Sequence, residues 1–113
     1  MNTDLLTKWR HLIEPETSSG ITPVDWDYVL RADLHVKERG QSVLVLRDCM
    51  IGGSPMRSIW VAAGELKDVV ELVNDAERDA KQDGKVAMIF MGRRGWARVC
   101  GYDELSVVGK KEL

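Results

Sequence analysis

A row of charged residues between Trp26 and Lys37 has the spacing that acid–base or metal chemistry requires. If this stretch is a strand, alternate positions share one face, and the polar face carries Asp33, His35 and Lys37. Asp33 or His35 would need a second carboxylate from a neighbouring strand to bind a cation or to act as a general base. Asp48, at the end of the next predicted strand, is the nearest by sequence. The alternative is a solvated sheet face without chemistry.

Two acid-x-lysine groups are the next candidates. Nucleases that bind Mg²⁺ with paired carboxylates and steady the attacking water with a lysine need both groups on one strand face. Glu65 and Lys67 have this spacing, but they follow Gly64 at the start of a predicted helix, where the helix dipole favours acidic residues in any case. The second group, "DGK" at 83–85, falls in a predicted turn and is interpreted as a loop.

The stretch "MGRRGWARVCGYD", at 91–103, combines guanidinium groups with an aromatic ring. Its flanking glycines fit a tight hairpin turn, which explains them without a function. The remaining residues have the usual ingredients of a nucleic-acid contact, with charges for phosphates and a ring for bases: Arg93, Arg94, Trp96 and Arg98. Trp96 could equally be a core residue of the following strand.

Composition limits the function classes. A chain of 113 residues with ordinary hydrophobic content predicts one soluble domain, and the start of the chain lacks a signal-peptide pattern, which predicts a cytoplasmic location. The net charge of −2 argues against a protein that coats nucleic acid, so any such contact must be a local patch. Cys49 and Cys100 have no metal-ligand spacing, and we expect them to be buried thiols.

Hydrophobic periodicity predicts an α/β fold with a single mixed sheet of about five strands, one N-terminal helix and one long helix packed on it. The helix that links two apolar strands implies a parallel pair within the sheet, and the first two strands should form an antiparallel hairpin. The predicted elements are a helix at 4–13, a mobile loop at 14–25, strands at 26–37, 43–46 and 57–63, a helix at 64–84, and strands at 85–90 and 96–102.

This order of elements resembles the restriction-endonuclease-like fold, and within it the archaeal and phage Holliday junction resolvases. The resemblance rests on the long helix containing "VNDAERDAKQDGK", followed by "VAMIFMGRRGWARV" and a closing "YDELSVV". It implies a metal-dependent endonuclease that acts on branched DNA as a homodimer, with Mg²⁺ as cofactor.

The active site implied by this resemblance is altered in this chain. Asp33 in "ADLHVK" matches the family's aspartate, but in "VLVLRDC" the acid position falls on Leu46 and the lysine position on Asp48. If Asp48, Glu65 and Lys67 are migrated replacements, they form the catalytic set with Asp33, and Asp33 and Asp48 bind the metal. Otherwise the fold has been kept for binding without cleavage.

Three functions therefore stay open from the sequence. The first is a metal-dependent nuclease, and the second is a catalytically degenerate module that binds nucleic acid through the arginine-rich hairpin. The third is a small interaction protein or inhibitor that engages another protein through the acidic face of the long helix, which carries seven acidic residues between Glu65 and Asp83. Asp33, Asp48 and Glu65 would have to converge within about 5 Å to share one cation.

Overall fold

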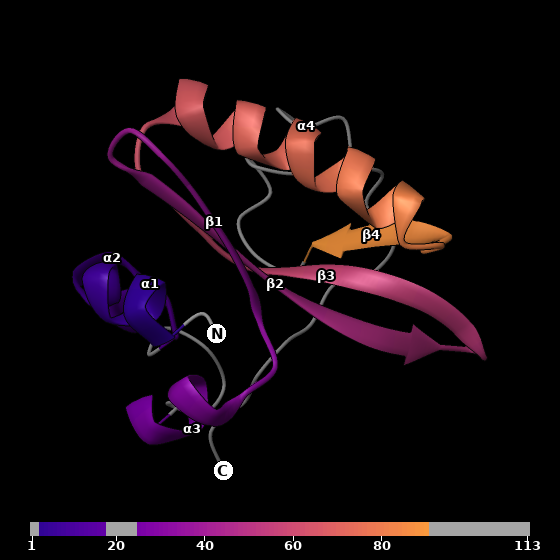
Figure 1. The fold of residues 1–113 in the computed structure, drawn as a ribbon, viewed down its shortest axis with the longest axis horizontal. Coiled ribbons are helices and arrows are strands. Elements are labelled where there is room, and N and C mark those ends of the chain that lie inside the picture. Colours follow the sequence, from indigo (N-terminus) through magenta and orange to yellow (C-terminus); the bar gives the residue numbers. More distant parts are fainter. Residues whose placement is uncertain (1–2, 18–24, 91–113) are drawn as a thin grey trace, which may run out of the picture.

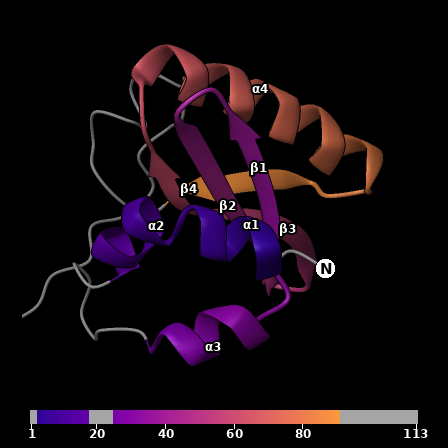
Figure 2. The same cartoon turned by 60° about the vertical axis from the view of Figure 1, so that its left-hand side comes forward.

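The structure is a computed structural model that describes residues 3–17 and 25–90. A mixed four-stranded sheet in the order β1-β2-β3-β4 separates three short helices on one face from one long helix on the other (Figures 1 and 2). This confirms the predicted α/β class with a single mixed sheet. The described sheet has four strands rather than about five, and the strand predicted at 96–102 lies outside the described residues.

The N-terminal segment forms two consecutive helices, α1 (Thr3–Lys8) and α2 (Arg10–Thr17). The predicted apolar face is buried against the sheet through Leu6, Trp9 and Ile13. The loop predicted from residue 14 begins too early, because α2 continues through Pro15, which has no N–H to donate within the helix. The rest of that predicted loop, residues 18–24, lies outside the described residues.

The strand predicted from Trp26 is wrong in its first half. These residues form a third helix, α3 (Trp26–Arg31), whose N-cap Asp25 accepts a hydrogen bond from the Asp27 amide at 3.2 Å. Helical geometry buries Val29 completely and leaves Tyr28 43% exposed, the reverse of the predicted strand. Val29, which interrupts the polar face of the supposed strand, was therefore the residue that indicated a helix.

The second half of the predicted strand is present as β1 (His35–Arg39), which pairs antiparallel with β2 (Ser42–Ile51) as expected. β2 pairs antiparallel with β3 (Ser54–Ala63) through a tight turn at Gly52 and Gly53. Both glycines have positive φ, 59° and 81°, which a two-residue type I′ hairpin requires. β2 extends five residues beyond its pairing with β1, and this end of β2 and β3, beside which β4 pairs with β3, is called the β2–β3 arm (Figure 1).

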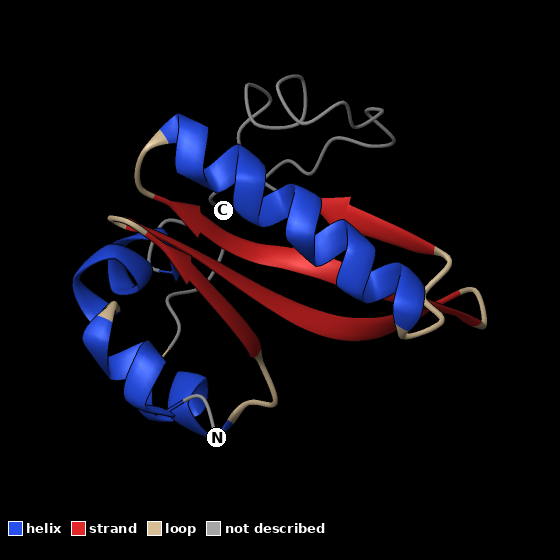
Figure 3. Cartoon of the chain, turned by 45° about the horizontal axis from the view of Figure 1, so that its top comes forward, coloured by secondary structure: helices blue, strands red, loops and turns tan. Residues whose placement is uncertain are grey.

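The long helix α4 (Leu66–Gln82) links β3 to β4 (Ala87–Phe90), and these two strands are parallel, as the sequence predicts. In Figure 3 α4 crosses the sheet diagonally. Among the helices that the structure describes, none is long and apolar enough to cross a membrane.

The apolar run at the centre of β2 is covered on both faces, as its composition predicts. Val43 and Val45 pack towards α1, α2 and α3, whereas Leu44 and Leu46 pack under α4. The two cores are thus joined through one strand. Polar contacts also reach across the layers, since the Trp9 indole donates to the Glu38 carboxylate of β1 at 2.5 Å.

Candidate functional site

The face of the sheet that carries α4 is organised in rows that cross β2, β3 and β4. Alternation along the strands and the observed register place the members of each row beside one another. The innermost row is apolar and largely buried and consists of Leu46, Ile59 and the partly buried Phe90. The second row contains an ion pair and consists of Asp48, Arg57 and Met88. The outermost row is apolar again and consists of Met50, Pro55 and Val86.

Arg57 is the centre of the second row, and its side chain is only 4% exposed. Its Nε donates to Asp48 Oδ1 at 2.7 Å, and its Nη2 donates to Asp83 Oδ2, just beyond the end of α4, at 2.8 Å. A buried guanidinium requires such partners, because an unpaired charge away from water is costly. The hydrogen bond from Arg57 holds the pKa of Asp48 well below its usual range, and the Asp48 carboxylate raises the pKa of Arg57.

His35 joins this network from β1. It lies opposite Leu46 in the register, so its ring is on the same face, and its Nε2 lies 3.1 Å from Asp48 Oδ2. The structure therefore brings together the histidine and the neighbouring-strand carboxylate that the sequence proposed as partners. Lys85 Nζ lies 3.5 Å from the same oxygen. An ionised carboxylate fixed by a buried arginine can orient an imidazole, which is the arrangement of a general base.

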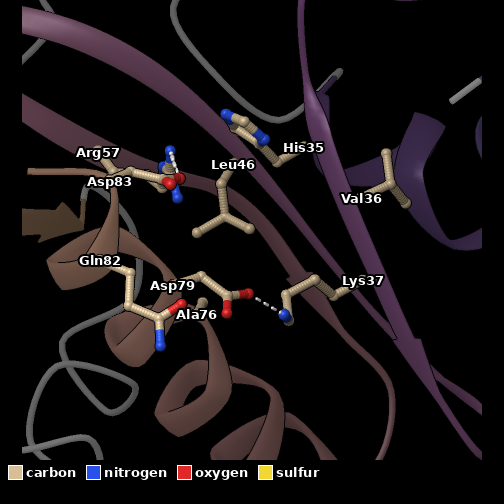
Figure 4. A pocket seen from close by; sticks show the side chains of 9 residues that line it. All are labelled: His35, Val36, Lys37, Leu46, Arg57, Ala76, Asp79, Gln82 and Asp83. Atoms are coloured by element: carbon tan, nitrogen blue, oxygen red, sulfur yellow. Dashed lines mark hydrogen bonds and ion pairs between the residues drawn. The ribbon is translucent and has the colours of Figure 1, made fainter. Parts of the chain in front are cut away.

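A cavity of about 320 Å³ opens beside this network, between β1, β2, β3 and the last turns of α4 (Figure 4). Figure 4 shows Lys37 from β1 paired with Asp79 from α4 on one side, and Arg57 paired with Asp83 on the other. Lys37 and the hydrogen bond that it donates lower the pKa of Asp79. The cavity is thus lined by charges that already have opposite charges as partners.

The other predicted catalytic residues do not join Asp48. The Glu65 amide contacts Ser42, which lies six residues before Asp48 on β2, so Glu65 is roughly 20 Å from Asp48 along the strand. Lys67 is exposed in the first turn of α4, and Asp33 is exposed in the link between α3 and β1. In the described part of the chain, no three His, Cys, Asp or Glu residues are grouped so that they could hold a metal ion.

Asp48 is also unsuited to be a metal ligand for a second reason. Its two carboxylate oxygens are contacted by Arg57, His35 and Lys85, so a cation would have to displace groups that are themselves donors or charged. The expected Mg²⁺ site at Asp33 and Asp48 is therefore not assembled by the described residues, and the nuclease interpretation stays a prediction from the sequence.

The predicted nucleic-acid contacts lie outside the described part of the chain, and the sequence missed Arg57, the centre of the ion-pair network. Arg93, Arg94, Trp96 and Arg98 lie outside the described residues. Asp83 was considered only as part of the "DGK" group interpreted as a loop, and Arg57 was not singled out by the sequence, although a signal for Arg57 existed. A two-residue turn at "GG" fixes the hairpin register, and counting back from that turn places Asp48 opposite Arg57.

The acidic face of α4 is partly neutralised within the chain. Arg39 at the end of β1 reaches Asp68 at 3.6 Å and also pairs with Glu71. The pair between Lys37 and Asp79 and the pair between Arg78 and Asp75 occupy further acids of the same helix. The acids that the sequence offered as a partner surface are thus mainly used to join α4 to β1 and to its own next turn. Cys49, expected to be buried, is half-buried on the arm.

Comparison with known proteins finds solved structures with the same fold but no matching family. No family model matches the chain, and no curated protein matches it either. Two solved structures share the fold. An aminoglycoside acetyltransferase from an uncultured soil metagenomic sample, solved in complex with trehalose, superposes with a TM-score of 0.69 at 10% identity, covering 98% of this chain and 90% of that chain.

The second structure is a mutant form of a protein from Thermus thermophilus. It superposes with a TM-score of 0.65 at 11% identity, covering 100% of this chain and 93% of that chain. Both likenesses extend over nearly the whole of each chain, so the chain has the fold of these proteins. At this level of identity, fold is all that the likeness shows.

Proposed function

We propose that this chain is an interaction protein that binds another protein through the exposed end of its β2–β3 arm. The observation that carries the proposal is the outermost row of the sheet, Met50, Pro55 and Val86. Met50 is 66% exposed and Val86 is 63% exposed, and neighbouring Ile51 is also exposed. A contiguous apolar row on an otherwise charged surface is typical of a contact site.

The position of the row supports a binding role. It continues the apolar face of the sheet past the last turn of α4, where the Asp48–Arg57 pair separates it from the core. The Val86 amide donates to the Pro55 carbonyl at 2.9 Å, so two chain segments hold the row together. Burial of the Met50 and Val86 side chains by a partner would each contribute roughly 1.5–3 kcal/mol.

Acetyl transfer is not carried over from the soil-sample acetyltransferase, because only the fold is shared. In α/β sheets, ligands bind outside the carboxyl ends of the parallel strands. The cavity beside Arg57 lies near the amino ends of β3 and β4, at the other end of the sheet. A protein contact at the arm requires neither that cavity nor a cofactor.

The proposal is tested by site-specific photo-crosslinking in cells of the source organism. A photoreactive residue in place of Met50 should give one adduct of defined mass, and the same residue in place of Lys67, exposed at the far end of α4, should give none. An adduct with twice the mass of the chain would identify a second copy as the partner. Equal adducts at both positions, or none at either, would contradict the proposal.

Matched variants establish that the row itself is the contact. Val86→Asp should abolish the Met50 adduct. Leu66→Asp makes the same change at an exposed leucine, 52% exposed, at the opposite end of α4, and should leave the adduct unchanged. Loss of the adduct in both variants would show that general loss of apolar surface, rather than this row, decides binding. Circular dichroism of each variant confirms that it is folded.

A further inference from the structure

The start of α4 is the place where this fold would present a site for phosphate. α4 begins just after the carboxyl end of β3, and helix N-termini at such positions bind anions through free backbone amides. An acetyltransferase needs an acetyl donor, and donors of the coenzyme A kind carry a pyrophosphate. Whether such a donor fits this chain therefore depends on the residues at the start of α4.

The connection between β3 and α4 is short, and a side chain of β2 forms hydrogen bonds with its backbone. Only Gly64 and Glu65 separate β3 from α4. The Glu65 amide donates to Ser42 Oγ at 2.8 Å, and the same hydroxyl donates to the Glu65 carbonyl at 3.4 Å. Ser42 is fully buried at the start of β2. The serine hydroxyl thus occupies the amide of the N-cap residue, one of the backbone donors available to an anion at the start of α4.

Gly64 shows how closely the two segments approach. Its φ is 121°, and a Cβ at this position would lie 2.3 Å from Ser42 Oγ and 2.5 Å from Ser42 Cα. Only a glycine fits against this serine. Ser42 therefore packs directly against the turn that leads into α4.

The charge of the first turn also opposes an anion. Glu65 is exposed at the N-cap, and Asp68 follows in the first turn, where Arg39 draws it towards the β1–β2 turn. A Cβ at Gly40 would lie 2.7 Å from Asp68 Oδ2, so this carboxylate is close to the backbone of that turn. Carboxylates at a helix N-terminus interact with the positive end of the helix dipole, which would otherwise attract phosphate, and they repel a phosphate group.

We infer that Ser42 closes the phosphate position of this fold, so that the chain binds no phosphate-bearing acyl donor at the start of α4. Ser42 is a positioning residue that fixes the start of α4 to β2 and serves in place of a ligand. The chain thus shares the fold of the soil-sample acetyltransferase, while its own serine holds the amide at the N-cap of α4. This inference is independent of the contact proposed at the arm, which lies at the other end of the sheet.

Amide NMR of the full chain tests the inference directly. Titration with coenzyme A, acetyl-coenzyme A or inorganic pyrophosphate should leave the amides of residues 64–68 unshifted. Saturable shifts of these amides with any of the three probes would overturn the inference, and this measurement needs no variant.

Hydrogen exchange tests the role of the serine. The Glu65 amide should exchange slowly in the wild-type chain and about tenfold faster in Ser42→Ala, because one hydrogen bond is lost. Ser54→Ala, at the far end of β3, is the matched control and should leave the exchange of Glu65 unchanged. Unaltered exchange of Glu65 in Ser42→Ala would show that Ser42 does not hold this amide.

Discussion

At the scale of single residues, the buried Arg57 pairs with the two carboxylates that lie between the sheet and the end of α4. Removal of its guanidinium would leave Asp48 and Asp83 without their main partner, whereas removal of Asp48 would leave a buried cation with one partner fewer. We expect Asp48→Asn to lower the unfolding free energy by about 1 kcal/mol, a modest effect because Asp48 is 39% exposed.

In an Arg57→Met background the same Asp48→Asn change should lower the unfolding free energy much less. The difference between the two backgrounds gives a coupling energy of roughly 1 kcal/mol. Urea denaturation of the four proteins of this double-mutant cycle measures the coupling. Additive effects would show that the two residues stabilise the chain separately. Methionine is the suitable replacement because it keeps most of the apolar stem of Arg57 in place.

The sequence predicted part of this network for a physical reason. His35 and Asp48 each stand in a stretch whose polar residues alternate with apolar ones, and the expected hairpin brings the two stretches together. Arg57 was missed because an arginine near a strand end ordinarily faces water. Its burial depends on the last turn of α4 lying over it, a tertiary contact that strand periodicity does not contain.

At the scale of elements, α3 shows where alternation misleads. A strand would place Tyr28 inside and Val29 outside, and the helix does the reverse. Val29→Ala should therefore lower the unfolding free energy by roughly 2 kcal/mol through the lost core contacts, whereas Tyr28→Ala should change it by at most about 0.5 kcal/mol. Thermal or urea unfolding of both variants provides the comparison. A larger loss for Tyr28→Ala would indicate that this segment is a strand.

The elements that were predicted correctly have long or strongly apolar sequence patterns, which tertiary contacts do not change. α4 repeats apolar residues every three or four positions over 17 residues, and the apolar run of β2 requires cover on both faces. α3 has only six residues, too few for a helical period to exceed an accidental alternation. The Asp25 cap was the local feature that distinguished the two, together with the buried Val29.

At the scale of the whole molecule, the layers are joined by ion pairs as well as by the two cores. Asp48 connects β2 to β1 and β3, Asp79 connects α4 to β1, and Glu38 connects β1 to α1 and the Trp9 turn. Each of these carboxyl groups has its pKa lowered in the folded chain, Asp48 mainly by Arg57, Asp79 mainly by Lys37 and Glu38 mainly by the Trp9 indole. The sheet is thus held to both helical layers by groups that must be ionised.

Acid should therefore loosen the whole molecule. A carboxyl group with a lowered folded pKa contributes stability that is complete above its unfolded pKa, near 4, and is lost as pH falls towards the folded value. The unfolding free energy should be nearly constant from pH 7 to about 5 and should decrease steadily below about pH 4. Urea unfolding at a series of pH values measures this slope.

Asp48→Asn should show a shallower decrease over the same acid range, since it removes the carboxyl group with the largest lowering of pKa. The difference between variant and wild type should be on the order of 1 kcal/mol after allowance for the exposure of Asp48. Asp33→Asn removes an exposed carboxylate outside the network and shows the effect of one lost negative charge alone. If the two variants show the same slope, the ion pairs of Asp48 do not contribute to the acid sensitivity of the fold.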